Sequence, residues 1–205
     1  VLINNAGIAV SGPISHVPVA SFRHQLEVNV IGLLQVTQAF IPLLKRSPNE
    51  NAGCIINIGS VSGLITSPFM GPYSASKFAV EALSDAMRRE LAFYNIRTVL
   101  MEPGPIATDI WEKAKQEDGS YTGTPFEPIL RNKLAIIEKT EKNALPVSAV
   151  TEEVLKVIQN ISYQNRKIIT KKAFLVKFIS KMLPSRMLDK MMISNMKRSE
   201  KLRPF

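Results

Sequence analysis

Cysteine and histidine are scarce in this chain of 205 residues, which has one cysteine and two histidines. The single cysteine, Cys54, cannot form an internal disulfide, and its place in an apolar run predicts a small buried core residue. Neither His16 nor His24 has a neighbour at metal-ligand spacing, so no metal site is expected. The shortage of cysteine is compatible with a reducing compartment, and we expect a cytoplasmic protein.

Apolar stretches long enough to cross a membrane are missing from the sequence as well. None approaches the roughly 18–20 consecutive residues that a membrane-spanning helix requires, and no signal peptide is visible. The first residue is Val1 rather than methionine, so we expect the gene product to start further upstream. The length of 205 residues is enough for one domain with a sizeable core.

Charge is distributed unevenly along the chain, whose net charge is +9. Residues 1–110 contain seven Lys/Arg and seven Asp/Glu, whereas residues 166–205 contain twelve Lys/Arg and two Asp/Glu. The basic character therefore belongs to the C-terminal segment. That segment has few aromatic residues on which bases could stack, so we expect no nucleic-acid partner.

Short apolar runs alternate with helical patterns. The run Cys54–Ile58 is rich in β-branched residues and stops at Gly59, which is typical of a strand covered on both faces of a parallel sheet. Other strands are predicted at 1–3, 97–102 and 167–170. Helices are predicted over 19–44, over 73–94 and from 148 or 151 to 161. The pattern predicts an α/β fold.

Three residues near the middle of the chain form a candidate proton-transfer site. Ser60 follows the predicted strand, and Tyr73 and Lys77 lie four residues apart on one face of the next predicted helix. A free tyrosine has a pKa of about 10, and a nearby ammonium group favours the phenolate and lowers that pKa. A serine hydroxyl can hydrogen-bond a reacting oxygen as charge develops on it. The implied reaction is proton exchange with an alcohol or a carbonyl group.

Three further motifs accompany this site, and the four stand in a fixed order. They are Asn4-Asn5-Ala6-Gly7 after an apolar run, Asn29 within a helical pattern, the Ser60 and Tyr73–Lys77 pair, and Pro103-Gly104-Pro105-Ile106-Ala107-Thr108 after another apolar run. Together they make residues 1–108 resemble the short-chain dehydrogenase/reductase family, with a looser resemblance to its retinol and hydroxysteroid dehydrogenases. The resemblance implies a doubly wound parallel sheet of the Rossmann type.

The resemblance also implies roles for individual residues. Tyr73 would exchange the proton, Ser60 would orient the carbonyl, and Lys77 would depress the pKa of the tyrosine and bind the nicotinamide ribose. Asn29 would sit at a helix kink and complete a proton relay. The cofactor would be NAD or NADP, and its contacts would come from Asn5, Ala6, Gly7, Tyr73, Lys77, Pro103, Gly104, Ile106 and Thr108.

One family motif, the glycine-rich phosphate loop TGxxxGxG, is not found in the sequence. We expect it upstream of Val1, together with the residue that selects NAD or NADP. Residues 1–165 would then form the C-terminal two-thirds of the catalytic domain. The first strands of the sheet would be absent from this chain, which would leave the strand at 1–3 as an edge.

The family varies most in the region that covers the substrate, here residues 111–145. Trp111, Tyr121 and Phe126 are candidates for the pocket wall, although ordinary packing explains them as well. Residues 166–205 form a basic amphipathic extension, in which the stretch 173–197 could contact an anionic membrane surface. Its methionines could instead close the substrate pocket or pack on a partner subunit.

The sequence thus predicts an NAD(P)-dependent oxidoreductase that interconverts an alcohol and a carbonyl on a hydrophobic substrate, such as a retinoid, a steroid or another lipid. By resemblance, a homodimer or homotetramer is expected. The helix over 73–94 would supply its interface through Ala79, Leu83 and Met87, unless these residues belong to the core. The alternative function is a non-catalytic structural or accessory subunit that keeps the dehydrogenase fold.

Overall fold

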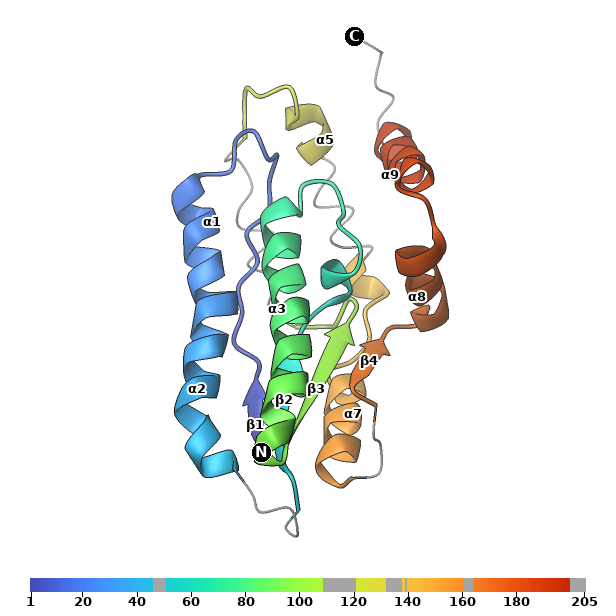
Figure 1. Ribbon diagram of the computed structural model, residues 1–205. Helices are drawn as coiled ribbons and strands as arrows, with labels where there is room; N and C mark the ends of the chain where they lie inside the picture. The colour runs from blue at the N-terminus through green and yellow to red at the C-terminus, as the bar shows by residue number, and fades with distance from the viewer. Residues whose placement is uncertain (46–50, 109–120, 132–137, 139, 161–163, 200–205) are drawn as a thin grey trace.

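A parallel four-stranded sheet forms the centre of the molecule (Figure 1). The computed structural model describes residues 1–45, 51–108, 121–131, 138, 140–160 and 164–199. The strands β1 (Leu2–Asn4), β2 (Gly53–Ile58), β3 (Ile96–Pro103) and β4 (Arg166–Ile169) lie side by side in that order. All three neighbouring pairs are parallel, so the predicted α/β fold with a parallel sheet is confirmed.

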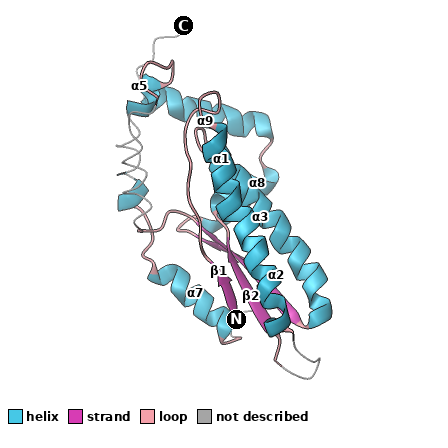
Figure 2. Ribbon diagram, turned by 90° about the vertical axis from the view of Figure 1, so that its left-hand side faces the viewer, coloured by secondary structure: helices cyan, strands magenta, loops and turns pink. Residues whose placement is uncertain are grey.

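Helices cover both faces of the sheet, as Figure 2 shows. Alternate residues of β2 point to opposite faces. Ile55 packs in one apolar cluster with residues of α2 (Gly32–Leu44) and α3 (Gly71–Glu90). Cys54 and Ile56 pack in a second cluster with Val157 of α7 (Ser148–Ile158). Burial on both faces explains why the strand reads as an uninterrupted apolar run, and it confirms Cys54 as a core residue.

The first helical stretch runs without a break from Val19 to Leu44. It consists of α1 (Val19–Leu26), a π-helical turn (Glu27–Ile31) and α2. Among the described residues this stretch is the one helix long and apolar enough, by length and composition, to cross a membrane. The expectation that no such segment exists was therefore wrong. Its buried side chains include the polar residues Gln25, Asn29 and Thr37, which hydrogen-bond to other parts of the domain.

The helix α3 carries Tyr73 and Lys77 and is followed by a 3-10 turn (Leu91–Tyr94). Pro72 lies in its first turn, where a missing backbone N–H costs nothing. Asn95, with a φ of 52°, ends the turn in the left-handed region that asparagine tolerates better than most residues. Two of the residues predicted either for a subunit interface or for the core belong to the core, because Met87 is buried and Leu83 packs against the core cluster.

The remaining described helices follow the predicted C-terminal layout. A short helix, α5 (Glu127–Arg131), precedes α7, and two helices, α8 (Ala173–Met182) and α9 (Ser185–Ser199), follow β4. In Figure 1, α8 and α9 stand beyond β4, with α9 near the end of the molecule to which the strands point. The division at residue 165 stays a prediction, but β4, which it assigned to the extension, is a full member of the sheet.

Candidate functional site

The strand ends bring the predicted site residues to one edge of the sheet. Ser60 follows β2 and the Asn5–Gly7 turn follows β1, while Gly104 follows β3. Because parallel strands all end at the same edge, these three turns meet there. Asn4 has a supporting role, since its Nδ2 donates hydrogen bonds to Asn57 Oδ1 (2.8 Å) and Thr37 Oγ1 (3.0 Å).

Asn29 is held in the π-helical turn by three hydrogen bonds. Its Oδ1 accepts from the Ile8 backbone N–H at 2.8 Å, and its Nδ2 donates to the Ile8 carbonyl and to Ser76 Oγ, both at 2.9 Å. The side chain is buried. The π turn is what displaces the helix locally and aims this amide at α3, and such turns are frequent at functional sites. The kink expected at Asn29 is therefore present.

Lys77 occupies the centre of the site. Its Nζ donates a hydrogen bond to the Ile58 carbonyl at 2.9 Å and lies 5.7 Å from the centre of the Tyr73 ring. Ser76, its neighbour on α3, donates from its hydroxyl to the Tyr73 carbonyl at 2.7 Å and accepts from Asn29. The structure thus brings Asn29, Tyr73 and Lys77 together, as the sequence predicted.

Ser60 completes the set from the other side. It begins a 3-10 turn (Val61–Gly63), and its Oγ accepts a hydrogen bond from the Ser62 backbone N–H at 3.1 Å. Its hydroxyl acts on the Tyr73 side chain as a hydrogen-bond partner that lowers the pKa of the phenol. A serine and a tyrosine that share a hydrogen bond can together hold a carbonyl oxygen.

The pKa values of the two titrating groups differ from the sequence-based expectation. Burial raises the pKa of the Tyr73 phenol above its ordinary value, and the hydrogen bond from Ser60 opposes this rise. The expected lowering by Lys77 was wrong for this arrangement, because the desolvation of the phenolate is the larger effect. Burial lowers the pKa of Lys77 to about 8, with Glu81 acting in the opposite direction. Lys77 is still mostly protonated at pH 7.

The residues predicted to contact a cofactor lie around this group. A Cβ atom at Gly7 would stand 3.5 Å from Asn29 Oδ1 and 3.9 Å from Lys77 Nζ, so this turn passes directly over the site. Asn5, Ala6 and Thr108 are exposed at the strand ends, and Pro103, Gly104 and Ile106 are half-buried. Their role in cofactor binding stays a prediction.

Close packing fixes the turn after β3. A Cβ atom at Gly104 would come within 2.9 Å of the Thr170 side chain, so a larger residue there would displace the segment after β4. Ile106 forms a bridge with Leu145, and Leu145 exchanges backbone hydrogen bonds with Pro105 and Ala107, both at 2.9 Å. These contacts hold the backbone of the predicted cofactor-binding turn in one position.

A cavity of about 350 Å³ adjoins the site. Its lining is mostly apolar and comes from Gly12, Pro13, Ile14, Thr66, Ser67, Pro68, Phe69, Gly71, Phe126, Leu188, Asp189, Met192 and Ile193. Gly71 precedes Tyr73 by two residues in α3, and Ser60, Tyr73 and Lys77 are not among the lining residues. Phe126 lines the cavity, in agreement with the prediction of a pocket wall rather than ordinary packing. Tyr121 instead donates a hydrogen bond to the Ser11 carbonyl at 3.1 Å, and Trp111 lies outside the described residues.

Sequence reasoning missed several polar residues that support the site. Gln25 accepts a hydrogen bond from the Val10 backbone N–H, and Ser76 links Asn29 to α3. Glu81 also went unnoticed, although its spacing of four residues from Lys77 puts it on the same helix face. That regular spacing was the available signal. Its partners Glu102 and Arg166 lie on strands that are far away in the sequence, so no local pattern pointed to them.

The sequence matches the short chain dehydrogenase family over residues 1–119. An NADPH-dependent 3-dehydrocapnine reductase from Ornithobacterium rhinotracheale is 41% identical over 97% of this chain and 70% of its own length. Mouse retinol dehydrogenase 16 is 38% identical over 56% of this chain and 35% of its own length. A 3-ketodihydrosphingosine reductase from Bacteroides thetaiotaomicron is 30% identical over 77% of this chain and 58% of its own length.

Solved structures share the fold. A short chain dehydrogenase from Burkholderia cenocepacia, in complex with NADP, superposes with a TM-score of 0.69 and 24% identity, over 92% of this chain and 69% of its own. A short chain dehydrogenase/reductase from Burkholderia phymatum, in complex with NAD, also gives a TM-score of 0.69, with 21% identity over 100% of this chain and 69% of its own. At these identities the likeness concerns the fold alone.

Proposed function

Because the chain belongs to the short-chain dehydrogenase/reductase family, we propose that it carries the proton-transfer half of an NADP(H)-dependent carbonyl reductase with a hydrophobic substrate. The observation that supports this most strongly is the convergence of four side chains from three parts of the chain. The Ser60 hydroxyl hydrogen-bonds Tyr73, Lys77 Nζ lies 5.7 Å from the Tyr73 ring, and Asn29 is tied to α3 through Ser76. A purely structural subunit would not require this set.

The raised pKa of Tyr73 suits the direction of reduction. A phenol that keeps its proton at neutral pH can donate that proton to a carbonyl oxygen as the oxygen becomes an alkoxide. Ser60 would hold the same oxygen through its hydroxyl. The protonated Lys77 then stabilises the phenolate that remains. Tyr73 thus supplies the proton, and a bound nicotinamide cofactor supplies the hydride that the carbonyl carbon receives.

The described residues fit a nicotinamide cofactor. Lys77 Nζ has three protons, and one of them is used on the Ile58 carbonyl, which leaves donors for ribose hydroxyls. Gly7 brings bare backbone to the side of that ammonium group, since a Cβ atom there would lie 3.9 Å from Lys77 Nζ. We favour NADPH over NADH because the 41% identical relative is named as NADPH-dependent. The solved structures include one complex with each cofactor.

The substrate class follows from the cavity beside Tyr73. Phe69, Phe126, Met192 and Ile193 contribute apolar surface to it, and a volume of about 350 Å³ lies within the range of small-molecule sites. The relatives act, by their names, on 3-dehydrocapnine, 3-ketodihydrosphingosine and retinol. We therefore propose a lipid-like ketone as the substrate, with its apolar part in this cavity and its carbonyl oxygen between Ser60 and Tyr73.

Replacement of Tyr73 by Phe in the intact gene product tests this function. The variant keeps the ring but lacks the proton, so kcat for NADPH-dependent ketone reduction should fall at least about 100-fold. NADPH affinity, measured by calorimetry, should stay close to that of the wild-type protein. Tyr94→Phe is the matched control, because Tyr94 is an exposed tyrosine of the 3-10 turn after α3. A Tyr73→Phe variant with near-normal turnover would contradict the assignment.

A further inference from the structure

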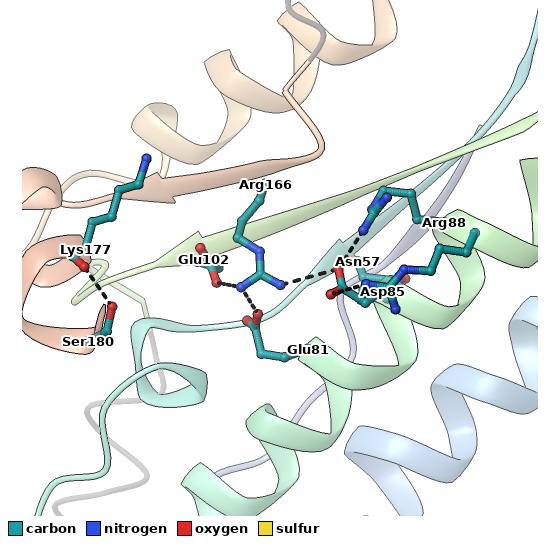
Figure 3. A network of polar contacts seen from close by, with 10 residues as sticks. Asn57, Glu81, Asp85, Arg88, Glu102, Arg166, Lys177 and Ser180 are labelled. Carbon is teal, nitrogen blue, oxygen red and sulfur yellow. Dashed lines mark hydrogen bonds and ion pairs between the residues drawn. The ribbon is translucent and has the colours of Figure 1, made fainter. Parts of the chain in front are cut away.

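A buried pair of carboxyl groups lies beneath the candidate site. Glu81 comes from α3 and Glu102 from β3, and Glu102 is fully buried. Arg166, from β4, is the cation between them (Figure 3). Its Nη1 lies 2.7 Å from Glu81 Oε2 and 3.4 Å from Glu102 Oε1, and its Nη2 lies 3.5 Å from Asp85 Oδ1. Arg166 therefore faces three carboxyl groups with one positive charge.

Buried oxygens of both glutamates, Glu81 Oε1 and Glu102 Oε2, lack a hydrogen-bond donor among the described residues. A proton held between the two carboxyl groups would satisfy both oxygens. Burial raises the pKa of both groups. For Glu81 the pKa reaches about 8, since its hydrogen bond to Glu102 and the charge of Glu102 add to the effect of burial while Arg166 opposes it. The pair therefore holds a proton to higher pH than two separate carboxyl groups would.

Glu81 packs against the turn that presents Ser60. A Cβ atom at Gly59 would lie 3.3 Å from Glu81 Oε1, and one at Gly63 would lie 3.0 Å from Glu81 Cγ. Because Gly59 and Gly63, one on each side of Ser60, have no side chains, the backbone of this turn packs directly against the Glu81 side chain. The Gly59 N–H donates to the Met101 carbonyl at 2.7 Å, next to Glu102. The carboxyl pair and the Ser60 turn are therefore one packed unit.

Glu81 is also the charged neighbour of Lys77. The two residues are one helical turn apart on α3, and ionisation of Glu81 acts to raise the pKa of Lys77. The other charged groups around the pair are Asp85 on α3, Arg166 on β4 and Lys181 on α8, which acts on Glu102. Lys77 is the only one of these cations that also approaches Tyr73 in the described part of the chain.

We propose that Glu81 is a positioning residue for the reaction, which supports the Ser60 turn and, by holding or releasing the proton it shares with Glu102, sets the charge of Lys77 beside Tyr73. This inference rests on the proposed function. While Glu81 keeps the proton, Lys77 has no full negative charge beside it. When the pair loses the proton, the new carboxylate stabilises the ammonium form of Lys77, which then survives to higher pH.

Two substitutions predict opposite effects on Lys77. Glu81→Gln keeps the shape and an amide donor for Glu102 but can never become negative, so the pKa of Lys77 should fall by about one unit. Glu102→Gln removes the neighbour that keeps Glu81 protonated, so Glu81 ionises earlier beside Arg166 and the pKa of Lys77 should rise. The pKa of Lys77 is read directly by competitive labelling with trace acetic anhydride and mass spectrometry between pH 6 and 10.

The alkaline limb of kcat/KM should move with these values, to lower pH in Glu81→Gln and to higher pH in Glu102→Gln. If Glu81 and Glu102 had only a structural role, both substitutions would lower activity alike. The pKa of Lys77 would then not shift in opposite directions in the two variants. Glu90→Gln is the matched control, because Glu90 lies on the same helix nine residues beyond Glu81, is exposed and does not act on Glu81 or Glu102, and it should leave Lys77 unchanged. Shifts of equal sign, or no shift, would overturn the inference. The labelling measures the pKa of Lys77 without any turnover, so it tests this inference even if the protein is not a reductase. A failure of the proposed function would instead appear in the Tyr73→Phe assay.

Discussion

At the scale of single residues, the protonation of the site depends on which side chains are buried together. The serine, tyrosine and lysine at the centre of the site are local in sequence, so the spacing of Tyr73 and Lys77 was enough to place them together. Burial is a property of the folded molecule. It raises the pKa of Tyr73. It also joins Glu81 to Glu102 and Arg166 on the neighbouring strands β3 and β4, where Arg166 is paired with Leu100, two residues before Glu102.

The protonation of Glu81 should appear in the stability of the protein. A carboxyl group whose pKa is raised to about 8 in the folded state stabilises the fold fully below its ordinary value, and this contribution is lost as the pH rises towards 8. The free energy of unfolding, from urea titrations, should therefore fall between pH 5 and pH 8. The fall should be smaller in Glu81→Gln. Lys77 does not mask this effect, because its lowered pKa alters stability mainly above pH 8.

The same titrations on Asp85→Asn provide the comparison. Asp85 is partly exposed, with 37% of its side chain accessible, and it belongs to the same ion-pair group through Arg166. Because the charge of Asp85 adds to the rise of the Glu81 pKa, its removal should reduce the fall in stability between pH 5 and pH 8, but by less than Glu81→Gln does. An unchanged slope in Glu81→Gln would mean that Glu81 ionises normally.

At the scale of elements, patterns of local origin predicted well. The helix over 19–44 and the strands at 54–58 and 97–102 appear within one or two residues of their expected ends. The C-terminal helices also appear, because their apolar spacing is a local signal. What α9 packs against was not predictable, and the structure supports more than one interpretation. Leu188 and Met192 line the cavity, whereas Met187 and Met191 are exposed.

The exposed side of α8 suggests contact with an anionic lipid surface, which we propose as a second role of this element. Phe174 and Phe178 are 84% and 47% exposed, and Lys177 and Lys181 lie beside them on the helix. Phe174→Asp/Phe178→Asp should weaken binding to phosphatidylserine vesicles about tenfold or more, since each change removes apolar burial and adds repulsion. Sedimentation with vesicles measures this. Phe93→Asp, at a phenylalanine that is 90% exposed in the 3-10 turn, is the control.

Two results would contradict this role. The first is equal binding of the double variant and the wild-type protein to phosphatidylserine vesicles. The second is binding that is as tight to neutral phosphatidylcholine vesicles as to anionic ones, because the basic residues would then contribute nothing. The local charge of the segment is strongly positive, with twelve Lys/Arg and two Asp/Glu over residues 166–205.

At the scale of the whole molecule, the apolar pattern of a helix does not tell a core face from a subunit interface. Ala79, Leu83 and Met87 were candidates for a core or for a subunit interface, and the core alternative holds for Leu83 and Met87. The reason is the position of α3, which packs against the sheet beside the long helix, so that its apolar stripe is used within the subunit (Figure 1). An oligomer through α3 would have to use a neighbouring face.

That neighbouring face consists of Ala75, Phe78 and Ala82, which share one side of α3 and are exposed, Phe78 by 45%. Small residues around a phenylalanine allow two helices to approach closely, and we propose that this stripe meets its own copy in a homodimer or homotetramer. Phe78→Glu places two negative charges opposite each other in each symmetric contact. The protein should therefore sediment as a monomer in velocity centrifugation at micromolar concentration. Phe93→Glu should sediment as the wild-type protein does. If Phe78→Glu keeps the wild-type sedimentation coefficient, the subunits associate through another surface, and α3 serves only the site within each of them.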